Sequence, residues 1–108
     1  MSKYQRKDFN TAPDDFTRVR MPNKNNREMF GYVEQLLGTS RMRVRCEDGK
    51  VRLGRVSGGK RRYMWVAEGD LVIVQTWEIE GDIKADIIFK YQRTQEFYLR
   101  SKGVLKDL

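Results

Sequence analysis

The sequence predicts an all-β protein: a single five-stranded barrel with a disordered, basic N-terminal arm and a short C-terminal helix. Three observations favour this fold class. Five short segments are rich in β-branched and aromatic residues, glycine-containing turn signals separate several of them, and 108 residues suit one modest domain. Hydrophobic residues make up 39% of the chain and charged residues 34%, so we expect a small core under a highly charged surface.

The N-terminal segment, residues 1–27, is polar and aperiodic. Such a composition buries too little apolar surface to order itself, so we expect a flexible arm. The barrel is expected to occupy residues 28–92. Its first strand covers residues 28–38, and Gly31 within it predicts a bend in a long strand.

The second strand, residues 41–46, shows the clearest alternation in the chain. One face carries Arg41, Arg43 and Arg45, and the other carries Met42, Val44 and Cys46. Asp48-Gly49 follows and predicts a tight hairpin turn, because both residues favour positive φ. The returning strand covers residues 51–56. Its alternation breaks at Gly54, where we expect a bulge that re-aims Arg55.

The last two strands follow a loop over residues 57–65. We expect the fourth strand at residues 71–79 and the fifth at residues 83–91, joined by a hairpin at Gly81-Asp82. The inward face of the fifth strand is expected to consist of Ile83, Ala85, Ile87, Phe89 and Tyr91.

A short helix and tail are expected over residues 93–108. Thr94 can cap the start of the helix, and Gly103 can end it. Phe97 and Tyr98 are expected to anchor the helix on the barrel.

Five short strands with a loop between the third and the fourth describe a small closed barrel, which removes most exposed sheet edges. An OB-fold is the expected architecture, because its first strand is long and bent and serves both halves of the barrel. An SH3-like barrel, which also has five strands, is the alternative.

The net charge of +7 arises from one window, residues 41–62. This window holds nine basic and two acidic residues, and the rest of the chain holds thirteen of each. Repulsion among like charges on adjacent strands opposes folding, and intermixed acids would maintain solubility equally well. We therefore expect a polyanionic partner, with nucleic acid ahead of a membrane surface. The alternative is that these arginines only keep the protein soluble.

Aromatic residues indicate where bases could stack. Tyr63 and Trp65 follow the basic run at residues 60–62, and rings beside a basic groove are typical of single-strand binders. Trp65 also has apolar neighbours, so a lid over the end of the barrel is the alternative role for this side chain. The candidate RNA-binding residues are Arg41, Arg43, Arg45, Arg52, Arg55, Lys60, Arg61, Arg62, Tyr63, Trp65 and Lys84.

Composition argues against several other functions. One cysteine, Cys46, and no histidine leave no disulfide, no Cys/His zinc site and no catalytic histidine, and we expect Cys46 to be a buried thiol. Gly58-Gly59 lacks the continuation of a phosphate-binding loop, and Asp14-Asp15 lies in the arm. We expect no enzyme, no cofactor and no metal. Without an apolar run of about 18 residues or a signal peptide, a cytoplasmic monomer that binds no membrane is expected.

Motifs across nearly the whole chain resemble one known family. They are Met21-Pro22-Asn23-Lys24, Gly31-Tyr32-Val33, the strand pair around Asp48-Gly49, Gly58-x-x-Arg61-Arg62-x-x-Trp65 and Lys84-Ala85-Asp86-Ile87-Ile88-Phe89-Lys90-Tyr91. The last two are the most specific. With these motifs the chain resembles archaeal and eukaryotic translation initiation factor 1A, the counterpart of bacterial initiation factor 1. The archaeal form is closer, since the long acidic tail of eukaryotic members is missing.

The resemblance implies an OB-fold that binds small-subunit rRNA at the decoding (A) site of the ribosome and supports placement of initiator tRNA in the P site. By position, Arg41, Arg43, Arg61 and Arg62 match family residues that contact rRNA. The basic arm matches a tail that reaches toward the tRNA. Further partners implied are the subunit-joining initiation GTPase and other initiation factors.

Two other functions remain open from the sequence. The first is a general single-stranded RNA-binding module of the OB or cold-shock type. Such proteins place several rings on the second and third strands, whereas residues 41–62 contain no aromatic residue. The second is an adaptor whose basic face meets an acidic protein.

Overall fold

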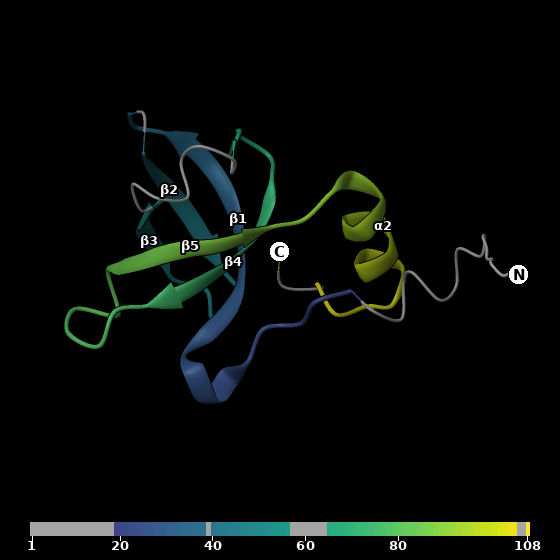
Figure 1. The fold of residues 1–108 in the computed structure, drawn as a ribbon, viewed down its shortest axis with the longest axis horizontal. Helices are drawn as coiled ribbons and strands as arrows, with labels where there is room; N and C mark the ends of the chain where they lie inside the picture. The colour runs from purple at the N-terminus through teal and green to yellow at the C-terminus, as the bar shows by residue number, and fades with distance from the viewer. Residues whose placement is uncertain (1–18, 39, 57–64, 106–107) are drawn as a thin grey trace, which may run out of the picture.

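The structure is a computed structural model and describes residues 19–38, 40–56, 65–105 and 108. Five strands close into a barrel in the order β1-β2-β3-β5-β4 (Figure 1). The elements are β1 (Glu28–Leu36), β2 (Arg41–Cys46), β3 (Val51–Arg55), β4 (Leu71–Thr76), β5 (Lys84–Lys90) and the helix α2 (Arg93–Ser101). This arrangement confirms the predicted five-stranded OB-fold barrel with a short C-terminal helix.

Strand β1 is shared by both halves of the barrel, because it pairs with β2 along one edge and with β4 along the other. Gly31 has a partner on each side. A Cβ at this position would lie 2.6 Å from Cγ1 of Val44, so the missing side chain lets β1 cross close to the core. The register shift of β1 lies further along the strand, between Val33 and Gln35.

The β2–β3 hairpin confirms the alternation predicted for residues 41–46, with the three apolar side chains buried. Its turn differs from the predicted one, since Gly49 has a positive φ of 88° and Asp48 does not. The expected bulge at Gly54 is wrong, because the β2–β3 pairing shows no register shift. Gly54 instead faces the core, where a Cβ would lie 2.8 Å from Cγ2 of Val44.

Strand β5 closes the barrel by pairing in parallel with β3 and antiparallel with β4. Ala85, Ile87 and Tyr91 are buried as predicted, and Phe89 is partly buried. Ile83 does not belong to the inward face, because it precedes the strand and is 55% exposed. Both strands of this hairpin are shorter than predicted, which leaves a longer loop between them.

Helix α2 starts and packs differently from the prediction. Its N-cap is Gln92, which takes part in a capping box, and not Thr94. Phe97 is 77% exposed, whereas Leu99 is 2% exposed, so the predicted anchoring by Phe97 is wrong. Gly103 follows the helix with a φ of 79°, as expected for a residue that ends a helix.

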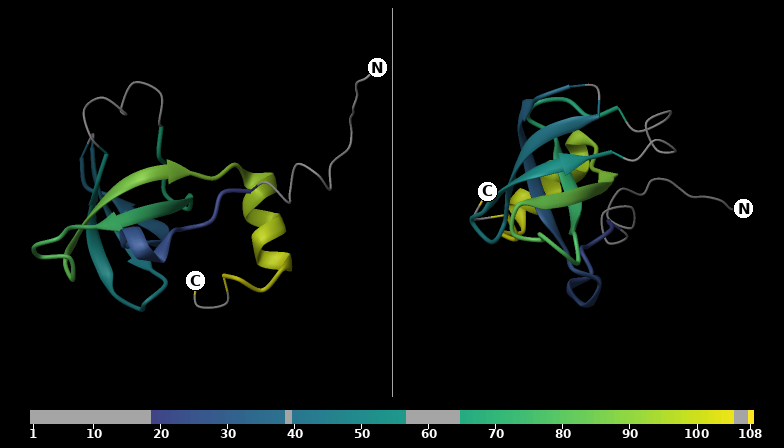
Figure 2. Two further views of the ribbon diagram at one scale, coloured as in Figure 1. Left: turned by 60° about the horizontal axis from the view of Figure 1, so that its bottom comes forward. Right: turned by 90° about the vertical axis from the view of Figure 1, so that its left-hand side faces the viewer.

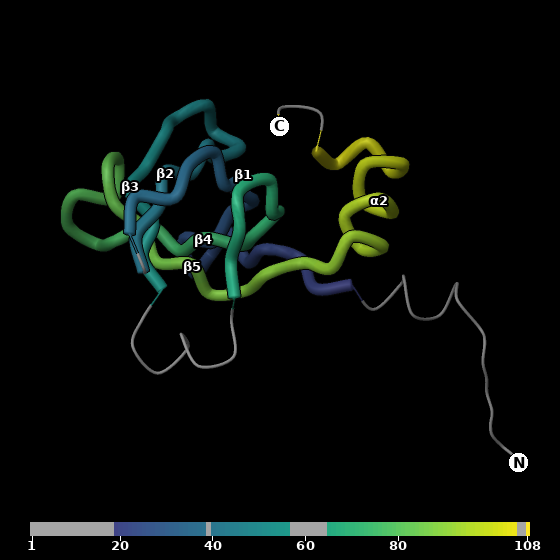
Figure 3. The backbone as a smooth tube through the Cα atoms, turned by 90° about the horizontal axis from the view of Figure 1, so that it is seen from above, coloured from purple at the N-terminus to yellow at the C-terminus, as the bar shows by residue number. Residues whose placement is uncertain are grey.

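The apolar core consists of two clusters. The first fills the barrel and comprises Val33, Met42, Val44, Cys46, Val56, Val72, Val74, Ala85 and Ile87. The second joins the barrel to the helix and comprises Val19, Phe30, Leu71, Ile73, Tyr91, Leu99 and Leu105. Tyr98 packs against the second cluster, in agreement with its predicted anchoring role. Figure 3 shows α2 beside the barrel.

Residues 19–27 run between the barrel and α2 (Figure 2). Val19 is buried in the second cluster, and the Tyr91 hydroxyl donates a hydrogen bond to a backbone carbonyl of this segment. A short 3-10 helix, η2 (Lys24–Asn26), precedes β1. The predicted arm extends to residue 27, but among the described residues the packed part of the chain begins at Val19. The rest of that arm, residues 1–18, lies outside the described residues.

Cys46 is fully buried in the barrel, as predicted. Its thiol lies 3.7 Å from the carbonyl oxygen of Val44 and can donate to it. Burial raises the pKa of the thiol, so Cys46 is held in its neutral, less reactive form.

Candidate nucleic-acid interface

Three adjacent strands place outward side chains in two rows on one face of the barrel. The first row, across β2, β3 and β5, consists of Arg41, Arg55 and Asp86. The second row consists of Arg43, Leu53 and Lys84. We call these six residues the three-strand face. Because it carries four cations and one carboxylate, its potential is positive.

Ion pairs neutralise part of this charge. Nε of Arg55 lies 3.3 Å from a carboxylate oxygen of Asp86, and Nζ of Lys84 lies 3.3 Å from a carboxylate in the β4–β5 loop. Arg41 and Arg43 have no acidic partner among the residues that the structure describes. The positive potential of the face is therefore concentrated on β2.

Arg45 continues the same strand, but its environment differs. Its guanidinium lies 3.4 Å from Glu34 and stands over the ring of Tyr32, with Cζ 5.6 Å from the ring centroid. Both partners belong to β1, so Arg45 is directed away from β3 and is largely neutralised. Of the three arginines predicted to share one face of β2, it is the one with an acidic partner.

Arg52 departs most clearly from its predicted place on the basic surface. Because the β2–β3 register is regular, Arg52 faces inward and is 4% exposed. It makes two charge-assisted hydrogen bonds to Asp48, at 2.9 and 2.8 Å, and donates from Nε to the carbonyl of Gly81. Its hydrogen bonds hold the pKa of the Asp48 carboxyl below its ordinary value. Arg52 thus ties the β2–β3 hairpin to the β4–β5 loop and is not available to RNA.

Trp77, which the sequence analysis did not single out, borders the three-strand face. Its indole Nε1 donates to Asp86 at 3.1 Å. Cζ of Arg55 and Nζ of Lys84 lie 4.9 and 5.1 Å from the ring centroid, within the range of cation–π contacts. The predicted β4–β5 hairpin could have identified this residue, because pairing of its two strands places Trp77 beside Lys84. In the structure, the backbone N–H of Trp77 donates to the carbonyl of Lys84.

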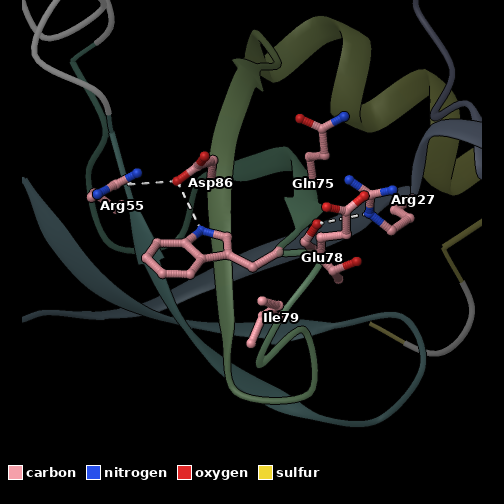
Figure 4. A pocket seen from close by; sticks show the side chains of 8 residues that line it. Arg27, Arg55, Gln75, Glu78, Ile79 and Asp86 are labelled. Atoms are coloured by element: carbon pink, nitrogen blue, oxygen red, sulfur yellow. Dashed lines mark hydrogen bonds and ion pairs between the residues drawn. The ribbon is translucent and has the colours of Figure 1, made fainter.

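Among the described residues, three cavities border this face. The smallest, about 170 Å3, lies beside Arg43 and Leu53. A second, about 190 Å3, is lined by Arg41, Leu53, Arg55, Trp77 and Lys84. The largest, about 400 Å3, shares Arg55 and Trp77 with the second cavity. Figure 4 shows Arg55 and Asp86 at one side of the largest cavity, with Arg27 and Glu78 at the other.

The remaining predicted site residues belong to the segment that joins β3 to β4. Lys60, Arg61, Arg62 and Tyr63 lie outside the described residues. Trp65 is described and is 81% exposed. Its side chain therefore does not act as a lid over the barrel, and its ring is accessible to a partner. Nζ of Lys90 donates to the backbone carbonyl of Trp65, which fixes the start of the return toward β4.

Within the described parts of the chain, no group of three or more Cys, Asp or Glu side chains is arranged to hold a metal ion. In the same parts, no helix has the length and apolar character needed to cross a membrane.

The strand order and the three-strand face together define the class of this protein: an OB-fold barrel with one strongly basic face. A family profile described as "Translation initiation factor 1A / IF-1" matches residues 17–107. The chain belongs to this family of translation initiation factors.

Two relatives of known sequence support the assignment over most of the chain. Translation initiation factor 1A of Methanococcus aeolicus is 52% identical over 96 residues, which cover 89% of this chain and 91% of that protein. Translation initiation factor 1A 2 of Methanosarcina acetivorans is 48% identical over 104 residues, which cover 94% of this chain and 98% of that protein. A solved structure, the bacterial translation initiation factor 1 from the Wolbachia endosymbiont of Brugia malayi, covers 64% of this chain and 82% of its own, with 28% identity and a TM-score of 0.48.

Proposed function

We propose that the protein binds the small ribosomal subunit through rRNA at the decoding (A) site, and that it supports placement of initiator tRNA in the P site. Membership of the initiation factor family supports the setting. The observation that carries the proposed contact is the pair Arg41 and Arg43, which project from β2 without an acidic partner among the described residues. Contacts with the initiation GTPase and other initiation factors, and action as a monomer in the cytoplasm, belong to the same proposal.

The geometry suits recognition of folded RNA through its phosphate backbone. The pairing of β2 with β3 holds the backbone of Arg41 and Arg43 in place, so binding has to order only their side chains. Each phosphate contact releases condensed counterions, which makes the binding dependent on salt. Binding of this kind occupies a site and needs no reacting group on the protein.

Pelleting with small subunits over a salt series tests the proposal. Arg41→Gln and Arg43→Gln should each weaken binding and make the slope of log affinity against log salt less negative by about 1, since each removes one proposed phosphate contact. Lys102→Gln is the matched control, because it removes one exposed charge from the end of α2.

The control separates a local contact from an effect of net charge. A Lys102→Gln protein with the wild-type slope would support the three-strand face as the contact surface. Equal loss in all three variants, or unchanged binding of Arg41→Gln and Arg43→Gln, would contradict it. Addition of initiator tRNA should increase retention of the wild-type factor on the subunit if the two bind adjacent sites.

A second candidate function is a general single-stranded RNA-binding module. The observation that favours it is the exposed ring of Trp65, since exposed aromatic side chains bind bases without sequence preference. Free oligoribonucleotides distinguish the two. Tight binding that grows with oligonucleotide length and equals binding to the subunit would favour the general binder.

A further inference from the structure

Three cationic side chains from three strands surround one cavity of the three-strand face. This cavity, of about 190 Å3, is lined by Arg41, Leu53, Arg55, Trp77 and Lys84. None of these lining residues is acidic, and Asp86 binds Arg55 without lining this cavity. Cations that stand this close repel one another, so an anion placed between them relieves the repulsion.

The cations retain donors for such an anion. Arg55 uses Nε for Asp86, and no hydrogen bond within the described residues involves its two terminal nitrogens. Arg41 lacks an acidic partner in the same part of the chain. Lys84 has three N–H donors and only one carboxylate contact, at 3.3 Å. A phosphate group has enough acceptor oxygens to bind all three side chains at once.

The rest of the cavity wall is apolar, which bears on what the anion is attached to. Leu53 lies in the second row, between Arg43 and Lys84, and the ring of Trp77 is fixed by its hydrogen bond to Asp86. Inorganic phosphate would leave this wall in contact with water. A phosphate joined to a nucleoside would cover it and gain apolar contact.

We propose that this cavity seats one phosphodiester group of an RNA strand, with Trp77 packed against the adjoining nucleoside. The inference rests on the proposed binding of RNA by the three-strand face and names one ligand position within it. It makes Arg41, Arg55, Lys84 and Trp77 specific contacts, whereas Arg43, which does not line the cavity, contributes only general attraction.

NMR of the two tryptophan indole N–H groups provides the direct test, with the signals assigned from a Trp65→Phe variant. A trinucleotide of RNA should shift the Trp77 signal in a saturable manner, and inorganic phosphate at the same concentration should shift it much less. Lys84→Gln should reduce the affinity for the trinucleotide about 5-fold more than Arg43→Gln does. Both variants remove one charge from the same face, but Arg43 does not line the cavity. An equal response to inorganic phosphate, or equal losses in the two variants, would overturn the inference.

Subunit pelleting separates this inference from the proposed function. Trp77→Leu should weaken pelleting about 5-fold or more while the salt slope stays at the wild-type value, because no charge is removed. Trp77→Phe should retain most of the affinity, and thermal unfolding of both variants checks that the barrel is intact. The wild-type protein could pellet with the subunit while Trp77→Leu has no effect and the Trp77 signal does not shift. That result would overturn the cavity assignment alone. No pelleting of the wild-type protein would overturn the proposed function itself.

Discussion

Val44 fills the space that two glycines leave free. Cβ atoms built on Gly31 and Gly54 would lie 2.6 and 2.8 Å from its two methyl groups, and Val44 is completely buried. The strands β1, β2 and β3 can therefore curve tightly around one side chain.

Gly31→Ala and Gly54→Ala should each destabilise the barrel by about 1 to 3 kcal/mol, the cost of overpacking a close-packed core. Urea unfolding measures this change. Gly38→Ala is the control, since a Cβ there meets nothing within 4 Å, and it should change stability by less than about 0.5 kcal/mol. Equal effects at all three positions would contradict the role assigned to Val44.

The Asp48–Arg52 pair makes stability depend on pH. The pKa of Asp48 lies below its ordinary value of 3.8 because of its hydrogen bonds from Arg52. A carboxyl whose pKa is lowered on folding stabilises the protein above about pH 4, and this contribution is lost as the pH falls through the folded-state pKa.

Asp48→Asn should destabilise the protein by about 1 to 3 kcal/mol at pH 7, because it leaves the buried guanidinium of Arg52 without its counter-charge. The side chain of Asp48 is itself 33% exposed, so solvent screening keeps the effect below that of a fully buried pair. The difference from wild type should shrink in unfolding measurements as the pH falls below about 4. Asp82→Asn, which breaks an exposed pair with Lys50, should show little change, and a similar loss there would contradict the assignment.

Among residues, sequence patterns placed side chains well only where the alternation is unbroken. Arg41 and Arg43 are exposed as the period of two required. Arg52 could not be placed, because Gly54 obscured the alternation of β3 and a buried arginine is recognisable only from its partners. Asp48 is near in sequence, but Gly81 comes from a loop that approaches only after the barrel closes.

At the scale of elements, α2 is held by residues different from those that its sequence suggests. Leu99 is buried against the barrel, and Phe97 faces solvent. Glu96 is also nearly buried and binds Arg93 and Arg100 within the helix, at 3.3 and 3.1 Å. The burial of Leu99 determines which face of α2 lies against the barrel, and Arg93 links the helix to the barrel by donating to the carbonyl of Gly69.

Leu99→Ala should destabilise the protein by about 2 to 5 kcal/mol, because it removes a buried side chain and leaves a cavity in the second cluster. Phe97→Ala removes a larger side chain from an exposed position and should change stability by less than about 1 kcal/mol. Thermal unfolding of the two variants measures the difference. If Phe97→Ala were the more damaging change, the orientation of α2 would be wrong.

The order and type of the strands and the helix were predictable from the sequence, and their ends and caps were less so. Turn signals at Asp48-Gly49 and Gly81-Asp82 marked both hairpins correctly. The start of α2 was misplaced at Thr94, because Gln92 is a rare cap whose role depends on a reciprocal bond with Gln95. The packing of residues 19–27 could not be predicted, because the partners of Val19 and Arg20 come from distant strands and from α2 and meet only in the folded protein.

For the whole molecule, the charge distribution favours binding at some expense of stability. Arg41 and Arg55 stand directly opposite each other on neighbouring strands, and like charges in this position repel. Arg41→Gln should therefore stabilise the free protein by about 0.2 to 1 kcal/mol at low salt while it weakens attachment to the subunit. Unfolding at two salt concentrations checks this, since added salt should reduce the gain. Destabilisation by Arg41→Gln would show that repulsion is not the dominant effect.

The double pairing of β1 also has a consequence for the synthesis of the protein. β1 leaves the ribosome before β4, and its second edge has no partner until β4 has emerged and folded back. The parallel pairing of β3 with β5 must wait still longer. Two open strand edges therefore accompany the nascent chain until β4 and β5 have emerged, and during this interval it can pair wrongly with other chains. A factor of the initiation machinery thus depends on the emergence of β4 and β5 during its own translation for protection against aggregation.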